Sequence, residues 1–352
     1  MKQKLFFLML VAATGICFSA NAKVWRVNNN NGVVAGAGTD FTSADAARAD
    51  SRVQNGDTLY FECSPTHYGN ITLNKRLTLI GSGYFLGGSA GNAGLQANTN
   101  AAILDGISMD SLASGSEILG LQFGDIYSAN DRAFAADNIT ISRCGFGVLF
   151  SIYYSQAAGV TADGWNVNKC YFDHVAGGAN VTNLKLQNNI ITGYVDLGNT
   201  ASSGNIVRNN VLRNAVHVYN GYFANNIISN NDLNFTNTIV KNNLAIGTQS
   251  NFTSYVGTNG NQQGFADAQI FKGAAGNSTD GQWQLASGSP ATGAGLTVGA
   301  VTTPDCGAFG GPDPYRLSGI PPIPAIYSLT VPASIPSGTA SMNITFSTRS
   351  NN

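Results

Sequence analysis

Charged residues are scarce in this sequence. Only 11% of its 352 residues are Asp, Glu, Lys or Arg, against about 25% in an average soluble domain. The formal net charge is -1, and there are 3 His. Because a protein that binds nucleic acid needs a clustered excess of Lys and Arg, we expect no nucleic-acid partner.

The sequence also has no apolar run that could span a bilayer, which takes about 20 residues. Its most apolar segment, Leu5 to Ile16, follows Lys2 and Lys4 and precedes a small-x-small triplet at 20–22. This order is typical of a secretory signal peptide. We therefore expect cleavage after Ala22, and a mature protein that is secreted, periplasmic or held at the cell surface without a transmembrane segment.

Cysteine is equally sparse. Four remain after the expected cleavage, namely Cys63, Cys144, Cys170 and Cys306. Their spacing matches no zinc pattern, so we expect neither a metal site nor a cofactor. Buried thiols that pack as small apolar residues are the favoured interpretation.

The sequence does contain a short repeated motif. It consists of an apolar residue, two residues of any kind, Asn or Cys, one further residue of any kind, and a second apolar residue. Six copies occur, 16 to 26 residues apart, and apolar residues alternate on both sides of each copy as in strands. The Asn or Cys positions are Cys144, Cys170, Asn189, Asn210, Asn226 and Asn243. A strand, a turn and a second strand bury their apolar sides only by stacking coil on coil, which predicts a solenoid.

The fold class that follows is all-β, a right-handed parallel β-helix. We expect the repeated Asn to point inward and to form a hydrogen-bonded ladder from coil to coil. Cys144 and Cys170 should lie next to each other on the same line, as free thiols or as a disulfide, and free thiols are favoured. The residues just before the ladder should then point outward to solvent: Arg143, Lys169, Asn188, Asn209, Asn225 and Asn242.

The two ends differ from the coils. The segment 42–53 predicts a short helix, with Thr42 or Ser43 as its N-cap, that covers the open first coil. Residues 316–352 read as a Pro-rich connector followed by two strands, at 326–331 and 342–347. The predicted organisation is therefore a signal peptide over 1–22, a β-helix over 23–315 and this appendage over 316–352.

Several segments carry a resemblance to a known family. NGDTLYF, YGNITLNKRLTLIGSGYF and AILDG resemble the opening coils of pectin lyase-like β-helix proteins, and the Asn motifs resemble the parallel β-helix repeat. The segments 283–295 and 305–311 resemble the final coil of exported bacterial members. The resemblance covers about 25–315, and it implies the β-helix fold and a carbohydrate ligand, either a polysaccharide or a cell-surface glycan.

The catalytic motifs of the family are not evident. The paired Asp, Gly-His-Gly and Arg-x-Lys of its hydrolases do not occur in the sequence. YFDH, at 171–174, is similar to the Asp-His pair of one pectate lyase family, but the second Asp cluster is missing. For a lyase, Arg143 and Lys169 could neutralise a sugar carboxylate, and Asp173 could supply acid-base chemistry. The simpler interpretation of these three is a solvated face.

Aromatic residues offer a second kind of site, because tyrosine rings stack on sugars. The candidates are Tyr153, Tyr154, Tyr171 and Tyr194. Tyr is also a good strand residue, so this signal is unspecific. The favoured hypothesis is a monomeric, exported, non-catalytic β-helix that binds carbohydrate or serves as a surface structure. The alternative is a polysaccharide lyase or glycoside hydrolase on the same scaffold.

Overall fold

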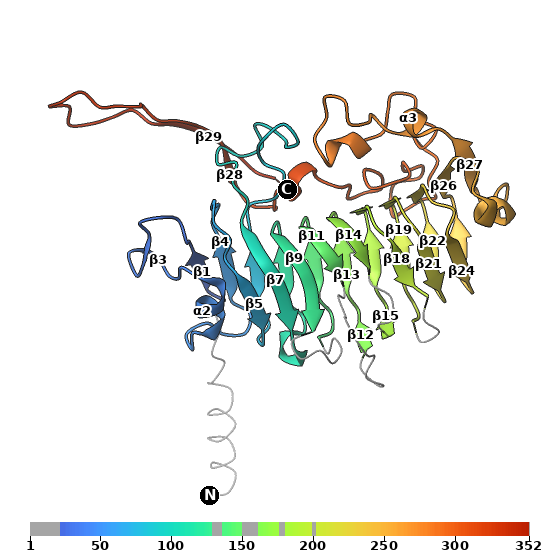
Figure 1. Ribbon diagram of the computed structural model, residues 1–352, viewed down its shortest axis with the longest axis horizontal. Coiled ribbons are helices and arrows are strands. Elements are labelled where there is room, and N and C mark those ends of the chain that lie inside the picture. The colour runs from blue at the N-terminus through green and yellow to red at the C-terminus, as the bar shows by residue number, and fades with distance from the viewer. Residues whose placement is uncertain (1–21, 129–135, 150–160, 176–179, 199–201, 352) are drawn as a thin grey trace, which may run out of the picture.

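The computed structural model describes residues 22–128, 136–149, 161–175, 180–198 and 202–351. Its strands stack in chain order along one axis, as Figure 1 shows, and pair in parallel from coil to coil. The chain is therefore a right-handed parallel β-helix, which confirms the predicted fold class.

Two long sheets carry this architecture within the described residues. In spatial order the first sheet contains β1 (Val24–Val27), β4 (Thr58–Phe61), β6 (Thr78–Ile80), β8 (Glu117–Leu119), β10 (Thr140–Ser142), β13 (Asn166–Asn168), β16 (Lys185–Gln187), β19 (Ile206–Arg208), β22 (Tyr222–Ala224) and β25 (Ile239–Lys241). The main path of the second contains β5 (Asn70–Leu73), β7 (Ile103–Met109), β9 (Gln122–Ser128), β11 (Gly145–Leu149), β14 (Tyr171–Val175), β17 (Ile190–Ile191), β20 (Val211–Leu212), β23 (Ile227–Ile228), β26 (Leu244–Ile246) and β27 (Gln262–Phe265). A branch from β14 adds β18 (Val195–Leu197), β21 (Val216–Tyr219) and β24 (Leu233–Thr236), and β12 (Thr161–Asp163) pairs separately with β15 (Asn180–Thr182).

The repeated motif sets the register of the coils. Ile141, Val167 and Leu186 are aligned in successive strands of the first sheet and are fully buried. In the second sheet Phe146 stacks on Phe172, with ring centroids 4.5 Å apart and planes 6° from parallel. Adjacent strands lie about 4.8 Å apart, so residues of the same kind in consecutive coils meet face to face and form a continuous core.

A short helix closes the first coil, as predicted. The helix α2 (Ala44–Ala49) begins after Ser43, whose hydroxyl accepts a hydrogen bond from the amide of Ala46 at 3.2 Å. Ala44 and Ala47 are fully buried. The small strands β2 (Val34–Ala35) and β3 (Gly38–Thr39) precede the helix.

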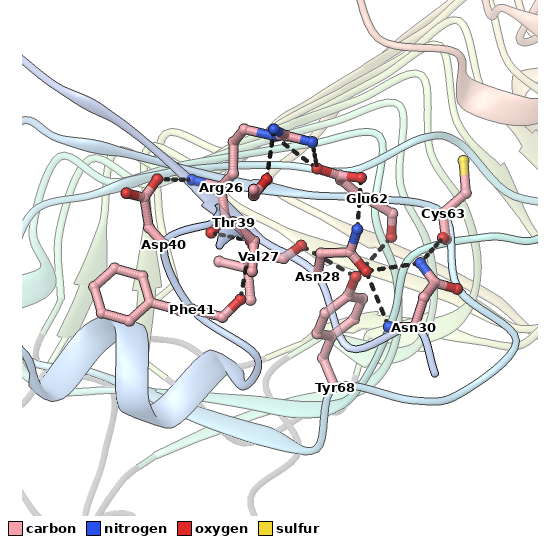
Figure 2. Close-up of polar contacts among 11 residues, drawn as sticks. Arg26, Val27, Asn28, Asn30, Thr39, Asp40, Phe41, Glu62, Cys63 and Tyr68 are labelled. Atoms are coloured by element: carbon pink, nitrogen blue, oxygen red, sulfur yellow. Dashed lines mark hydrogen bonds and ion pairs between the residues drawn. The ribbon is translucent and has the colours of Figure 1, made fainter. Parts of the chain in front are cut away.

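Polar contacts join β1 and the residue after it to the coil that contains β4 (Figure 2). Glu62 forms an ion pair with Arg26 and accepts a hydrogen bond from Asn28 at 2.8 Å. The hydroxyl of Tyr68 donates to the carbonyl oxygens of Val27 and Glu62, at 3.1 and 2.9 Å. The first strand is thus held to the next coil by side-chain hydrogen bonds as well as by its pairing with β4.

The chain after β27 does not add a further coil. The helix α3 (Asp267–Ile270) and the short 3-10 helix η3 (Gly281–Trp283) lead into a segment that runs back along the outside of the coils (Figure 1). We call residues 294–320 the C-terminal strap. The expectation that 283–295 and 305–311 form a final coil is therefore wrong.

Beyond the strap the chain forms the predicted two-strand appendage. The strands β28 (Ala325–Thr330) and β29 (Thr345–Arg349) pair antiparallel, and the hairpin extends away from the coils in Figure 1. Three further 3-10 helices are η1 (Ser111–Ala113), η2 (Ser250–Tyr255) and η4 (Leu317–Gly319).

Candidate functional site

The predicted Asn ladder is present. The side-chain amide of Asn189 donates to Oδ1 of Asn210 at 3.0 Å, and the same bond links Asn210 to Asn226 and Asn226 to Asn243. Asn261 adds one more rung at 3.1 Å. The sequence pattern missed Asn261 because Thr258 and Gln263 take the places of its two apolar neighbours.

Cys144 and Cys170 continue this line as two free thiols. The amide of Cys144 faces the sulfur of Cys170 at 3.4 Å, and the amide of Cys170 donates to Oδ1 of Asn189 at 2.9 Å. Both side chains are fully buried. Burial raises the pKa of the Cys170 thiol well above its ordinary value, which disfavours the reactive thiolate at this position.

The residues before the ladder, which we call the corner row, do not point to solvent. All six have left-handed backbone, with φ between 49 and 57°, and five are buried. From the last coil to the first, each side chain contacts the strap: Asn242 at Ala294, Asn225 at Leu296, Asn209 at Asp305, Asn188 at Ala308, Lys169 at Asp313 and Arg143 at Ile320. The predicted solvated face is therefore an internal interface.

One sequence signal could have revealed this cover. The residue after each ladder Asn points outward but is apolar: Ile190, Val211, Ile227 and Leu244. These four are buried in a second hydrophobic cluster together with Cys306, Ala308 and Tyr315 of the strap. Four outward apolar residues in consecutive coils indicate that another segment must cover them.

The strap separates the residues predicted for a lyase. Arg143 and Lys169 lie beneath the strap, and Lys169 is paired with Asp313. Asp173 lies on β14 and is exposed. The structure thus does not bring the two cations and Asp173 together in one solvent-facing site.

Asp173 belongs instead to an exposed group on β14, β18, β21 and the turns beside them. We call it the His–Asp face, and its residues are Asp173, His174, Tyr194, Asp196, His217 and Asp232. Nδ1 of His174 lies 2.8 Å from Asp173, and Nε2 of His217 lies 3.0 Å from Asp232. On its other side, Nδ1 of His217 lies 4.0 Å from Asp196.

The local sequence explains this arrangement. Val175, Val195 and Val216 are aligned in three adjacent strands and point inward. Since side chains alternate across a strand, Asp196 and His217, which follow Val195 and Val216, point outward side by side. Gly193 leaves room for Asp173, because a Cβ atom at this position would meet Oδ1 of Asp173 at 2.5 Å.

The predicted tyrosines occupy different places. Tyr194 is 37% exposed, and its ring packs on that of His174 with centroids 4.3 Å apart. Burial, together with the charges of Asp196 and Asp173, raises the pKa of Tyr194. Tyr171 is half-buried against Phe85, at 5.1 Å between centroids. Tyr153 and Tyr154 lie outside the described residues.

The chemistry available on the His–Asp face is hydrogen bonding and ring stacking. Exposed carboxylates accept bonds from sugar hydroxyls, imidazoles can donate or accept them, and Tyr194 offers an aromatic surface. Within the described ranges, no cluster of three or more His, Cys, Asp or Glu side chains is placed to hold a metal ion.

No protein-family model, curated protein or solved structure matches this chain. Across the part of the chain that the structure describes, no helix has the length and apolar character that crossing a membrane requires.

Proposed function

We propose that the chain is an exported, non-catalytic β-helix protein that binds an uncharged polysaccharide through the His–Asp face. The observation that carries this proposal is the exposed ring of Tyr194, which packs on the half-buried ring of His174 at 4.3 Å, beside the carboxylates of Asp173 and Asp196. A stacking surface beside hydrogen-bond acceptors is what a sugar ring with several hydroxyl groups requires.

The charge of the face favours a neutral ligand. Asp173, Asp196 and Asp232 are all exposed there, with side-chain exposures of 56, 38 and 67%. The nearby cation Arg213 is paired with Asp267 at 2.7 Å. Because like charges repel, the three carboxylates of this face would disfavour a uronic-acid polymer.

The same features argue against a lyase. Elimination next to a uronate needs a base and also a cation or metal to hold the carboxylate. Arg143 and Lys169 could have supplied the cation, but both lie under the strap. We expect no release of unsaturated uronate from pectate or alginate, measured by ultraviolet absorbance.

The proposed binding is tested by affinity electrophoresis of the purified chain against neutral polysaccharides. Tyr194→Ala should weaken binding about threefold to tenfold, because an aromatic contact contributes about 0.5–1.5 kcal/mol. Tyr222→Ala is the matched control, since Tyr222 points outward from the first sheet and should leave binding unchanged. Equal losses in both variants, or no binding to any neutral glycan, would refute the proposal.

A glycoside hydrolase remains the second candidate, because one observation favours it. Asp196 and Asp232 approach His217 from its two sides, and paired carboxylates are the usual machinery of glycosidases. Release of reducing ends from a neutral polysaccharide, lost in Asp196→Asn and retained in Asp105→Asn, would establish it. Asp105 is the matched control because it pairs with His67, at 2.7 Å, in an earlier coil.

A further inference from the structure

The hairpin of β28 and β29 has one apolar face that is largely exposed. In its register Leu329 lies opposite Phe346, and Ile326 lies opposite Thr348. Directly opposed residues share a face of a sheet, and so do alternate residues of one strand, which adds Val331 and Ile344 at the outer end. Five apolar side chains, each 45–60% exposed, form what we call the apolar hairpin face: Ile326, Leu329, Val331, Ile344 and Phe346.

The opposite face of the hairpin is polar. It carries Ser328, Thr330, Thr345 and Ser347, and no residue from 325 to 348 is charged. A two-stranded hairpin that stands alone in water is at best marginally stable, and an antiparallel sheet with one apolar face normally packs on that face. The apolar hairpin face is therefore suited to pack against another surface.

A cavity of about 320 Å³ opens at the base of the apolar hairpin face. Ile326 and Leu329 line it from the hairpin, Ile323 lines it from the segment before the hairpin, and Tyr60 and Ala97 line it from the early coils. None of its lining residues is charged. The amide of Ala97 donates to the carbonyl oxygen of Ile326 at 2.9 Å, which holds the two sides together. A volume of this size accommodates a small ligand or a large side chain.

The composition of the apolar hairpin face indicates the kind of partner that fits it. Without Lys or Arg from 325 to 348, the face has no cation to attract the anionic headgroups of a membrane. Without Asp or Glu, it has no anion to attract a basic protein. Its complement is another uncharged apolar face, and a second copy of this chain supplies one. The hairpin projects past the N-terminal coils in Figure 1, where a second copy can reach it.

The exposed area is sufficient for a weak dimer. The five side chains expose about 500 Å² in each copy, so two copies would bury about 1,000 Å², which is near the lower limit for a specific interface. Contiguous apolar patches of this size commonly mark interaction sites.

We infer that the chain forms a reversible homodimer in which two apolar hairpin faces pack against each other. The contact is isologous, so each copy offers the same surface that it receives. The two hairpins run antiparallel, and Phe346 of each copy, the most exposed of the five side chains, enters the cavity of the other copy. A dimer thus replaces the monomer expected from the sequence, and it leaves the His–Asp face free.

Sedimentation velocity of the full chain over a range of concentrations tests the inference. We expect a monomer–dimer equilibrium with a dissociation constant on the order of 10 μM, because an interface of this size is weak. Phe346→Thr should raise this constant about tenfold to a hundredfold, since it removes an apolar ring from the contact, while Thr remains a good strand residue. Ala97→Phe should also raise it, because the new ring fills the cavity and leaves the sequence of the hairpin unchanged.

Leu112→Thr is the matched control. Leu112 is 68% exposed on η1, outside the apolar hairpin face and its cavity, so this variant should dimerise as the unmodified chain does. A chain that stays monomeric up to about 1 mM, or unchanged dimerisation in either Phe346→Thr or Ala97→Phe, would overturn the inference. Binding of a monomer to vesicles of phosphatidylglycerol and phosphatidylcholine, lost in Phe346→Thr, would also overturn it and would assign the face to a lipid surface.

Discussion

Two neighbouring residues turn the chain at the corner of each coil, and they face opposite ways. The ladder residue, such as Asn210, points inward and bonds to the coils on both sides. The residue before it, Asn209, adopts left-handed backbone and contacts the strap. Asn suits both places, since its amide mimics a backbone group and it tolerates positive φ.

The sequence predicted the first of these roles and not the second. The ladder was predictable because apolar residues three before and two after each Asn fix its inward direction. The corner row was not, because alternation alone assigns Arg143 and Lys169 to solvent. Their actual partners, Ile320 and Asp313, lie more than 140 residues away, and no local pattern encodes such a contact.

At the residue scale, Asn210→Leu should destabilise the protein by about 1–3 kcal/mol. The amide and side chain of Asn189 both lose their acceptor, and Oδ1 of Asn226 loses its side-chain donor, all in a buried place. Denaturant unfolding measures the change. Asn230→Leu, at a half-exposed position, should change stability by less than about 0.5 kcal/mol, and equal effects would contradict a buried ladder.

The strap is the element that the coil pattern did not predict. It covers four outward-pointing apolar residues, which we call the outward apolar row: Ile190, Val211, Ile227 and Leu244. Its own Cys306 and Tyr315 are buried against them. The carboxylate of Asp280 joins it to an early loop, accepting bonds from the amide of Ser318 at 2.7 Å and from Asn92 at 2.8 Å. The segment 305–311, which resembles a final coil, lies within the strap and forms no strand there.

This buried network should make the strap sensitive to alkali. Burial raises the pKa of both Tyr84 and Tyr315 well above the ordinary value. The folded state therefore keeps two protons that the unfolded chain releases above about pH 10. Below that pH the two tyrosines make their full contribution to the free energy of unfolding. Above it the free energy of unfolding falls as pH rises, by up to about 1.4 kcal/mol per pH unit for each tyrosine.

Tyr84→Phe removes one of the two titrating groups, so the loss of stability above about pH 10 should become less steep than in the unmodified chain. Denaturant unfolding at a series of alkaline pH values measures the slope. An unchanged slope would mean that Tyr84 ionises as freely in the folded protein as in the unfolded one.

In the whole molecule, the strap runs along the stack of coils and links them to one another. In a simple solenoid each repeat contacts only its neighbours, so the ends can open independently. Here the strap contacts six successive coils, and Gly319 reaches the coil of Arg143, where a Cβ atom would meet the carbonyl oxygen of Arg143 at 2.2 Å. The strap thus couples the last coil to the middle of the stack, and we expect unfolding in one cooperative step.

Gly319→Val should uncouple the last coils from the middle of the stack. The substitution places a side chain on the backbone of Arg143 and the ring of Tyr84, at a residue with φ of 53°. We expect the strap to detach from the coils and the outward apolar row to become exposed to solvent. The strands β23, β26 and β27 should then lose hydrogen-exchange protection before β10 and β13. Gly338→Val is the matched control, because Gly338 has φ of 84° but nothing within 4 Å of an added Cβ. It carries a similar backbone penalty without the clash, and should keep a single transition with uniform protection. If Gly319→Val also unfolded in one step, the coils would have to be coupled through the ladder and core alone.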